Sequence, residues 1–342
     1  MAHAQSGMLE SATRLLPLSE SSSPTTVFEP ETFDELLSAT SEQLATADIA
    51  RVNLLCATGL RGAENLDIPE CLAKLDRWAE EVRQFTAWNF LHVFKPRTPR
   101  DTPGFFRCWS LVKLLRHHKG LQHALTPPGL KPGEKYISRS TGRGKNSTYY
   151  SSDSVFIHGL LGERKLGLCT TFPVLYAAVG RRLGYPLKVA LSVSYVFNIW
   201  DDPADSFNID AGKFHIAAEP DEHFIDTPRP WTDEEKNCGA LLRPLNPVEE
   251  FGLFLGWRAI HLEVNGRYEE AIELCDMALR LFPNNPVHPW IARRIETERV
   301  RVFMEEDGWG YEPEDDEPET DEMLPQPPAV GDSEPPNVNP PD

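Results

Sequence analysis

The order of apolar and polar positions divides the chain into a helical first part and a mixed second part. Over residues 68–82 the apolar side chains recur every three or four positions, the period of a helix with one face on a core. Pro69 suits the first turn of such a helix. Further helices are expected over 105–121 and around the apolar run 53–57. The pattern therefore predicts a helical leader over 28–125.

A different pattern begins near the middle of the chain. Small and apolar residues predict a helix over 169–183, which ends before Gly184 and Pro186. Three strand-like runs follow, with a polar turn between the last two, at 186–193, 196–200 and 207–210. A helix next to antiparallel strands indicates an α+β domain, which we place at 153–245.

The segment 251–285 matches a single tetratricopeptide unit, which is a pair of antiparallel helices. Small residues, a turn glycine and a terminal proline have the spacing of that repeat, at Ala259, Gly266, Tyr268, Ala271, Ala278 and Pro283. One unit cannot bury its own apolar face, because repeats stack on their neighbours. We therefore expect a tetratricopeptide-like helical pair at 246–304 that docks on the main domain or on a partner.

Three segments have the composition of disordered chain or loop. Residues 1–27 are rich in Ser and Thr, and 126–152 are rich in Gly, Pro, Ser, Lys and Arg, which predicts a long basic loop. The segment 305–342 holds fourteen acidic residues and no Lys or Arg, and nine prolines follow residue 308. We expect a disordered N-terminal segment and a disordered, acidic, Pro-rich tail.

The charge distribution excludes some classes of partner. The formal net charge is −18, and about −14 of it belongs to the tail, so the rest of the chain is nearly balanced. A balanced body argues against a nucleic-acid or anionic-membrane surface. The six cysteines form no C-x-x-C pair, which favours a reducing compartment. With no secretory leader and no apolar run of roughly 20 residues, we expect a cytoplasmic protein; the sequence does not specify its oligomeric state.

The candidate chemistry centres on Cys169, at the start of the helix expected over 169–183. A thiol in the first turn of a helix faces unpaired backbone N–H groups and the positive end of the macrodipole, and both favour the thiolate. The same donors can receive an oxyanion. Nucleophilic cysteines of acyl-transfer enzymes need this placement, so we expect a nucleophile position here. The alternative is a buried cysteine that only packs.

Six segments of the chain carry a resemblance to a known family, at 53–57, 75–79, 167–169, 173–188, 207–211 and 220–223. Together they resemble the transglutaminase-like superfamily, which has a papain-like cysteine fold. The likeness spans roughly residues 45–290 and is greatest to a bacterial branch with a helical leader and a C-terminal tetratricopeptide segment. It implies an α+β core in which the cysteine helix packs on an antiparallel sheet.

The resemblance also implies a Cys–His–acid site that attacks a glutamine or peptide carbonyl. By position, Cys169 matches the nucleophile and Asp210 matches the acid that orients the imidazole. Tyr195 stands where the family has His, and Ile199 stands where Arg is usual. A phenol with a pKa of about 10 is neutral at pH 7 and a poor base. Losses on the order of 10³-fold or more are then expected, so whether the chain is an enzyme stays open.

Three histidines could supply the missing base, namely His158, His215 and His223. The plainer explanation for each is a structural or surface role. Likewise, Tyr195 could be a core aromatic residue, and Asp210 could cap the turn after its strand. His117, His118 and His123 have no Cys or carboxylate at zinc-site spacing, so no metal is expected, and no cofactor is expected either.

These observations predict a transglutaminase-like cysteine acyl-transfer fold with a degenerate site that is weakly active or inactive. Its expected partner is a protein or peptide, and neither nucleic acid nor membrane is expected. The alternative is a non-catalytic interaction scaffold, or pseudoenzyme, that uses the former cleft and the tetratricopeptide surface. A third hypothesis is a regulated hydrolase whose acidic tail occupies the basic loop.

Overall fold

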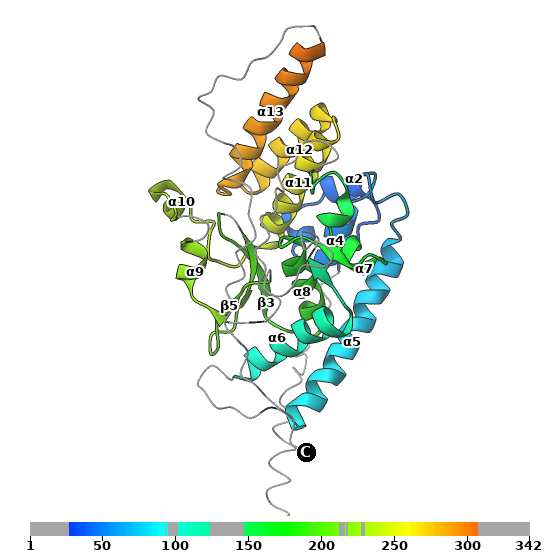
Figure 1. Cartoon of the computed structure of the whole chain (residues 1–342), viewed down its shortest axis with the longest axis vertical. Coiled ribbons are helices and arrows are strands. Elements are labelled where there is room, and N and C mark those ends of the chain that lie inside the picture. Colours follow the sequence, from blue (N-terminus) through cyan, green and yellow to red (C-terminus); the bar gives the residue numbers. More distant parts are fainter. Residues whose placement is uncertain are drawn as a thin grey trace, which may run out of the picture.

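The computed structural model of the 342-residue chain describes residues 27–92, 94, 102–123, 147–193, 195–211, 216, 218–226 and 230–306. These residues form a helical body, a small antiparallel sheet and a C-terminal group of helices (Figure 1). The mixture of helices with an antiparallel sheet agrees with the expected α+β class. Nearly all of the two expected disordered ends, and most of the expected basic loop, lie outside the described residues. The predicted domain boundaries remain predictions.

The first part of the chain is helical, as its periodicity predicts. Its α-helices are α2 (Phe33–Leu37), α3 (Ser41–Leu44), α4 (Ile49–Leu55), α5 (Ile68–His92) and α6 (Pro103–Lys113), and α6 continues into the π-helical turn η1 (Leu114–His118). The helices expected over 68–82 and 105–121 are thus confirmed, although α5 is longer. It continues past the predicted end because Phe85 still has aromatic partners, with Trp109 and His118 at ring-centroid distances of 6.4 and 5.1 Å.

Helix α8 (Thr171–Arg182) occupies the centre of the molecule (Figure 1). It packs against strands β3 and β4 of the sheet and against α4, α5 and α6. Every residue from Thr171 to Gly180 is buried, so the helix is apolar around its whole circumference. A side chain at Gly180 would place its Cβ 3.1 Å from Leu187 of β3, which explains a small residue at this contact.

The sheet is antiparallel, with strands in the order β3 (Leu187–Leu191), β4 (Val196–Trp200), β5 (Phe207–Ile209) and β6 (Ala218–Glu219). The three predicted strand runs are confirmed as β3, β4 and β5, and β4 and β5 flank the predicted polar turn. All five residues of β4 are buried, because α8 packs against this strand and Phe197 also stacks on Phe224 of α9 (Asp221–Ile225), with centroids 4.0 Å apart. Helix α10 (Asp233–Asn237) follows α9.

A second pairing of strands lies just before α8. The two-residue strand β1 (Gln122–His123) pairs in parallel with β2 (Leu166–Gly167), and His123 is the register partner of Gly167. The chain between them includes the 3-10 turn η3 (Ser152–Ser154) and helix α7 (His158–Leu161). These short elements determine the path of the chain that leads to Cys169, although no sequence pattern predicted them.

The C-terminal helices form a hairpin and one further helix. The hairpin of α11 (Pro247–Val264) and α12 (Tyr268–Leu281) turns at Gly266, whose φ of +77° favours glycine. It confirms the expected helical pair, but the sequence analysis missed α13 (Val287–Glu306), which packs on both.

The hairpin docks on the helical body, which is one of the two arrangements expected for a single repeat unit. Helix α11 packs against α3 and α4, and the Arg258 guanidinium donates to the carbonyl oxygens of Cys56 and Thr58 at 2.8 Å each. Arg181 of α8 pairs with the buried Glu250 carboxylate of α11. These polar contacts fix the hairpin beside the sheet (Figure 1).

Candidate active site

Cys169 lies in the turn between β2 and α8, and not in the first turn of the helix as the sequence suggested. Helix α8 begins at Thr171, with Thr170 as its N-terminal cap residue. The Thr171 hydroxyl fixes this start, because it lies 3.0 Å from each of the carbonyl oxygens of Ser154 and Val155 and donates to them. The cysteine is therefore held two residues before the helix, at a site that is only 5% exposed.

The sequence analysis predicted a lowered pKa for the Cys169 thiol, and this prediction is wrong. Burial and the Asp210 carboxylate raise the pKa of the thiol from 9.0 to about 12. The backbone N–H groups of Thr170 and Cys169 act in the opposite direction, as the sequence predicted, but they are the smaller effects. Desolvation of a thiolate outweighs two N–H donors because burial penalises the charged form. At pH 7 the side chain is a neutral thiol.

Asp210 and Tyr195 reach the same place from the sheet. Asp210 directly follows β5 and is 5% exposed, and Tyr195 directly precedes β4 and is 4% exposed. Burial first, then Asp210 and Cys169, raise the pKa of the Tyr195 phenol above its usual value. The structure thus brings these three predicted residues into one buried cluster. Among the described residues, the Tyr195 hydroxyl has no hydrogen-bond partner.

His223 also reaches this cluster, but it does so through the acid. Its Nε2 lies 3.1 Å from Asp210 Oδ2, and its Nδ1 lies 3.9 Å from Glu219 Oε2. Both ring nitrogens therefore face carboxylates. An edge-on contact with the Phe224 ring, at a centroid distance of 4.9 Å, also restrains the His223 imidazole.

The other two histidines proposed as bases do not join the described site. His158 begins α7, where its Nε2 lies 3.3 Å from both Ser152 Oγ and the Gly62 carbonyl oxygen. Burial lowers its pKa, and none of the groups that act on it belongs to the cysteine cluster. His158 is therefore a structural residue and not a replacement base. His215 lies outside the described residues.

Two residues of the site were missed by the sequence analysis. His123 lies within electrostatic range of Asp210, and burial and then Arg116 lower the pKa of its imidazole to about 4. The Arg116 guanidinium stacks over the Phe172 ring of α8 at 4.1 Å. His123 was weighed only as a metal ligand. Its strand has two residues, too few to give a periodic signal, and only the pairing with β2 reveals its position.

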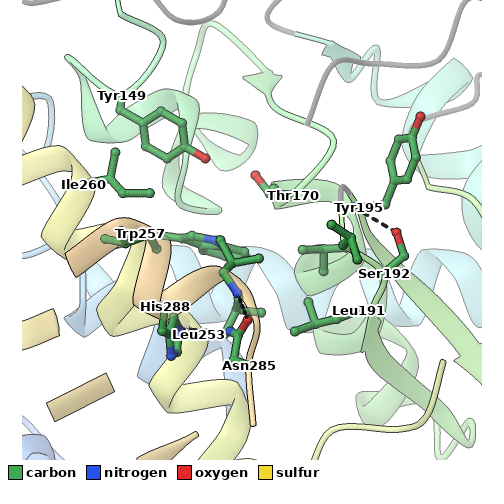
Figure 2. A pocket seen from close by; sticks show the side chains of 14 residues that line it. Tyr149, Thr170, Leu191, Ser192, Tyr195, Leu253, Trp257, Ile260, Asn285 and His288 are labelled. Carbon is green, nitrogen blue, oxygen red and sulfur yellow. Dashed lines mark hydrogen bonds between the residues drawn. The ribbon is translucent and has the colours of Figure 1, made fainter. Parts of the chain in front are cut away.

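An apolar pocket of about 50 Å³ adjoins the cysteine cluster (Figure 2). It lies between the β3–β4 connection on one side and α11 and the start of α13 on the other. Tyr195 of the cluster and Thr170, which follows Cys169 in the chain, both form part of its wall. The Tyr195 N–H donates to Ser192 Oγ at 3.2 Å, which holds the β3–β4 connection at the pocket edge (Figure 2).

Comparisons with protein-family models, with curated proteins and with solved structures gave no match to this chain. The described residues contain no group of three or more His, Cys, Asp or Glu side chains placed to hold a metal ion. In the same described ranges, no helix has both the length and the apolar composition needed to cross a membrane.

Proposed function

We propose that this chain is a transglutaminase-like cysteine acyl-transfer fold whose site no longer turns over substrate, and that it acts by binding a protein or peptide. The observation that carries the proposal is the state of Cys169, a buried thiol whose pKa is raised to about 12 with a carboxylate as a charged neighbour. Acyl transfer begins with a thiolate, and a site that opposes its formation opposes the first step.

Among the residues that the structure describes, the neighbours of Cys169 also lack a group suited to take its proton. The Tyr195 phenol stays neutral at pH 7, since burial and two acidic neighbours raise its pKa. Burial and Arg116 lower the pKa of His123 to about 4, so this imidazole is a weak proton acceptor and its protonated form is unfavourable at neutral pH. His223 presents both of its ring nitrogens to carboxylates. Among the described residues near Cys169, none therefore forms the thiolate–imidazolium pair of a cysteine acyl-transfer enzyme.

Replacement of Tyr195 by His tests the proposal. The purified chain is mixed with a glutamine donor and an amine probe, and we expect no product above background. Tyr195→His introduces an imidazole at a position that interacts with both Asp210 and Cys169, and general-base catalysis contributes about 10²–10⁴-fold. We expect product to appear in this variant and to vanish when Cys169→Ala is added.

Tyr195→Phe is the matched control, because it removes the hydroxyl and keeps an aromatic ring without adding a base. It should remain as inactive as the parent. Robust product from the parent that disappears in Cys169→Ala would refute the proposal. His215→Ala would then show whether that residue supplies the base.

A second candidate is a cysteine acyl-transfer enzyme with residual activity. The hydrogen bond between His223 and Asp210 favours it, because an acid–imidazole pair is half of a Cys–His–acid site. Turnover would require the Nδ1 edge of His223 to leave Glu219 and face the thiol. Glu219→Gln should then raise the rate and His223→Gln should abolish it. Under the main proposal, neither variant changes the background rate.

A further inference from the structure

The wall of the pocket beside the cysteine cluster has a buried hydroxyl group without a hydrogen-bond partner in the part of the chain that the structure describes. Thr170 is 4% exposed, lines the pocket, and its hydroxyl has no hydrogen-bond partner among the described residues. Figure 2 shows the Tyr149 hydroxyl pointing across the pocket toward Thr170. A buried hydroxyl left without a partner is unfavourable, because it has lost its hydrogen bonds to water. A ligand that bonds to Thr170 would remove that cost.

The rest of the wall is mostly apolar, and in the described ranges of the chain it carries no acidic or basic side chain other than His288. Eight apolar side chains form most of it: Leu191, Val193, Val196, Leu253, Trp257, Ile260, Val287 and Ile291. None of the described residues that line the pocket is Asp, Glu, Lys or Arg. His288 also lines it, and burial lowers the pKa of that imidazole to about 4, so it is neutral at pH 7.

This lining selects a chemical class of ligand. A charged group would lose its hydration in the pocket without meeting an opposite charge, which is costly. An aliphatic side chain would be stabilised by burial against the apolar wall. The two hydroxyls beside that wall can bond to a neutral polar group, and a backbone amide next to an aliphatic side chain carries both features.

From this arrangement we infer that the pocket binds an uncharged aliphatic side chain of a peptide, with the adjacent backbone amide bonded to Thr170 and Tyr149. The inference rests on the binding role proposed above and gives that role a place and a ligand class. The site lies next to Cys169, where the acyl group of a substrate would lie in an active relative. The same pocket would therefore hold a residue of the bound chain beside the inactive thiol.

The test uses the full chain carrying Cys169→Ala, so that no turnover contributes to the signal. The probe is acetyl-Gly-Ala-Leu-Ala-Gly-amide, and its comparison peptides carry Asp or Lys in place of Leu. Isothermal titration calorimetry should detect the Leu peptide and show binding at least about tenfold weaker for both charged peptides. Equal binding of the three peptides, or no binding of the Leu peptide, overturns the inference.

Two substitutions locate the site. Leu253→Phe fills the pocket and should weaken binding of the Leu peptide more than tenfold. Thr170→Val keeps the side-chain volume and removes the unbonded hydroxyl, so it should weaken binding about fivefold. Because Thr170→Val leaves the packing unchanged, it decides the matter if Leu253→Phe fails to fold. Unchanged affinity in Thr170→Val overturns the proposed amide contact.

Tyr176→Phe is the matched control for the hydroxyl. Tyr176 is 1% exposed, its hydroxyl also lacks a partner among the described residues, and it does not line the pocket. Its substitution should leave the affinity for the Leu peptide unchanged, and a loss equal to that of Thr170→Val overturns the inference. Turnover by the parent would refute the proposed function alone, whereas absence of peptide binding would refute the ligand class alone.

Discussion

Removal of the Asp210 charge should make Cys169 more reactive, which is the opposite of its effect in a working Cys–His–acid enzyme. Asp210→Asn keeps the size of the side chain and an oxygen that can accept from His223 Nε2. It removes the negative charge that raises the pKa of the thiol. Burial remains in the variant, so the pKa should fall but stay above that of an exposed cysteine.

The low reactivity expected of Cys169 in the parent follows from comparing its pKa with that of an ordinary thiol. A thiol with the ordinary pKa of 9.0 is about 1% thiolate at pH 7, whereas Cys169, at about 12, is about 0.001% thiolate. Alkylation by iodoacetamide proceeds through the thiolate, so Cys169 should react about 10³-fold more slowly than an ordinary thiol. Burial of the sulfur slows it further. Its labelling rate should increase tenfold per pH unit up to about pH 12.

The assay is labelling with iodoacetamide from pH 7 to pH 10, read at each cysteine peptide by mass spectrometry. Cys275, on helix α12, is an internal control, because its pKa is also raised to about 12, but by burial and Asp276 and not by Asp210. Asp210→Asn should accelerate labelling of Cys169 and leave Cys275 unchanged. Slower labelling of Cys169 in the variant would mean that Asp210 stabilises the thiolate through an imidazolium, and the reasoning would fail.

Two further predictions concern stability, and both are measured by urea denaturation. Gly159→Ala should lower the free energy of unfolding by about 3 kcal/mol or more, because its Cβ would lie 1.6 Å from the Asp153 carbonyl oxygen. The control Gly162→Ala, with its nearest atom at 3.2 Å, should cost under about 1 kcal/mol, and equal losses would contradict the packing at α7. Arg258→Met should cost about 2–3 kcal/mol, because two hydrogen bonds are lost from a buried guanidinium to the carbonyl oxygens of Cys56 and Thr58, just after α4. A loss below about 0.5 kcal/mol would show that these bonds do not hold the hairpin.

Elements with a clear period could be predicted from the sequence, and short or charged elements could not. The helix over 68–82 was found because it buries one face, which gives a helical period of apolar residues. The strand runs of β3 and β4 were found because nearly all of their residues are buried, which gives a short continuous apolar run. Helix α13 was missed because its apolar stripe is short and charged residues fill most of its other positions. Its buried side chains, Ile291 and Ile295, join the core. Ion pairs add to this packing, such as that of Arg294 with Glu263 of α11 and that of Arg301 with Glu298 within the helix.

Spacing along the chain also located the candidate site, but it did not set the chemistry there. The order of Cys169, Tyr195 and Asp210 along the chain led to three residues that the structure places in one cluster. The direction of the thiol pKa could not be read from that order, because it depends on how much water the fold excludes. The carboxylates that face both nitrogens of His223 come from the ends of two neighbouring strands, β5 and β6, and only tertiary structure brings them together.

The charge of Asp210 explains why one substitution can reverse the character of the whole site. Beside an imidazolium, a carboxylate stabilises the positive charge that in turn stabilises a thiolate. Without an imidazolium, the same carboxylate acts on the sulfur directly and raises its pKa, which is the arrangement beside Tyr195. Asp210→Asn should therefore accelerate labelling of Cys169 in the parent and slow it in Tyr195→His. The two substitutions act on one electrostatic cluster, so their effects on the labelling rate should not be additive. If Asp210→Asn changed the labelling rate of Cys169 in the same direction in both backgrounds, the carboxylate would not act on Cys169 in the way its position implies.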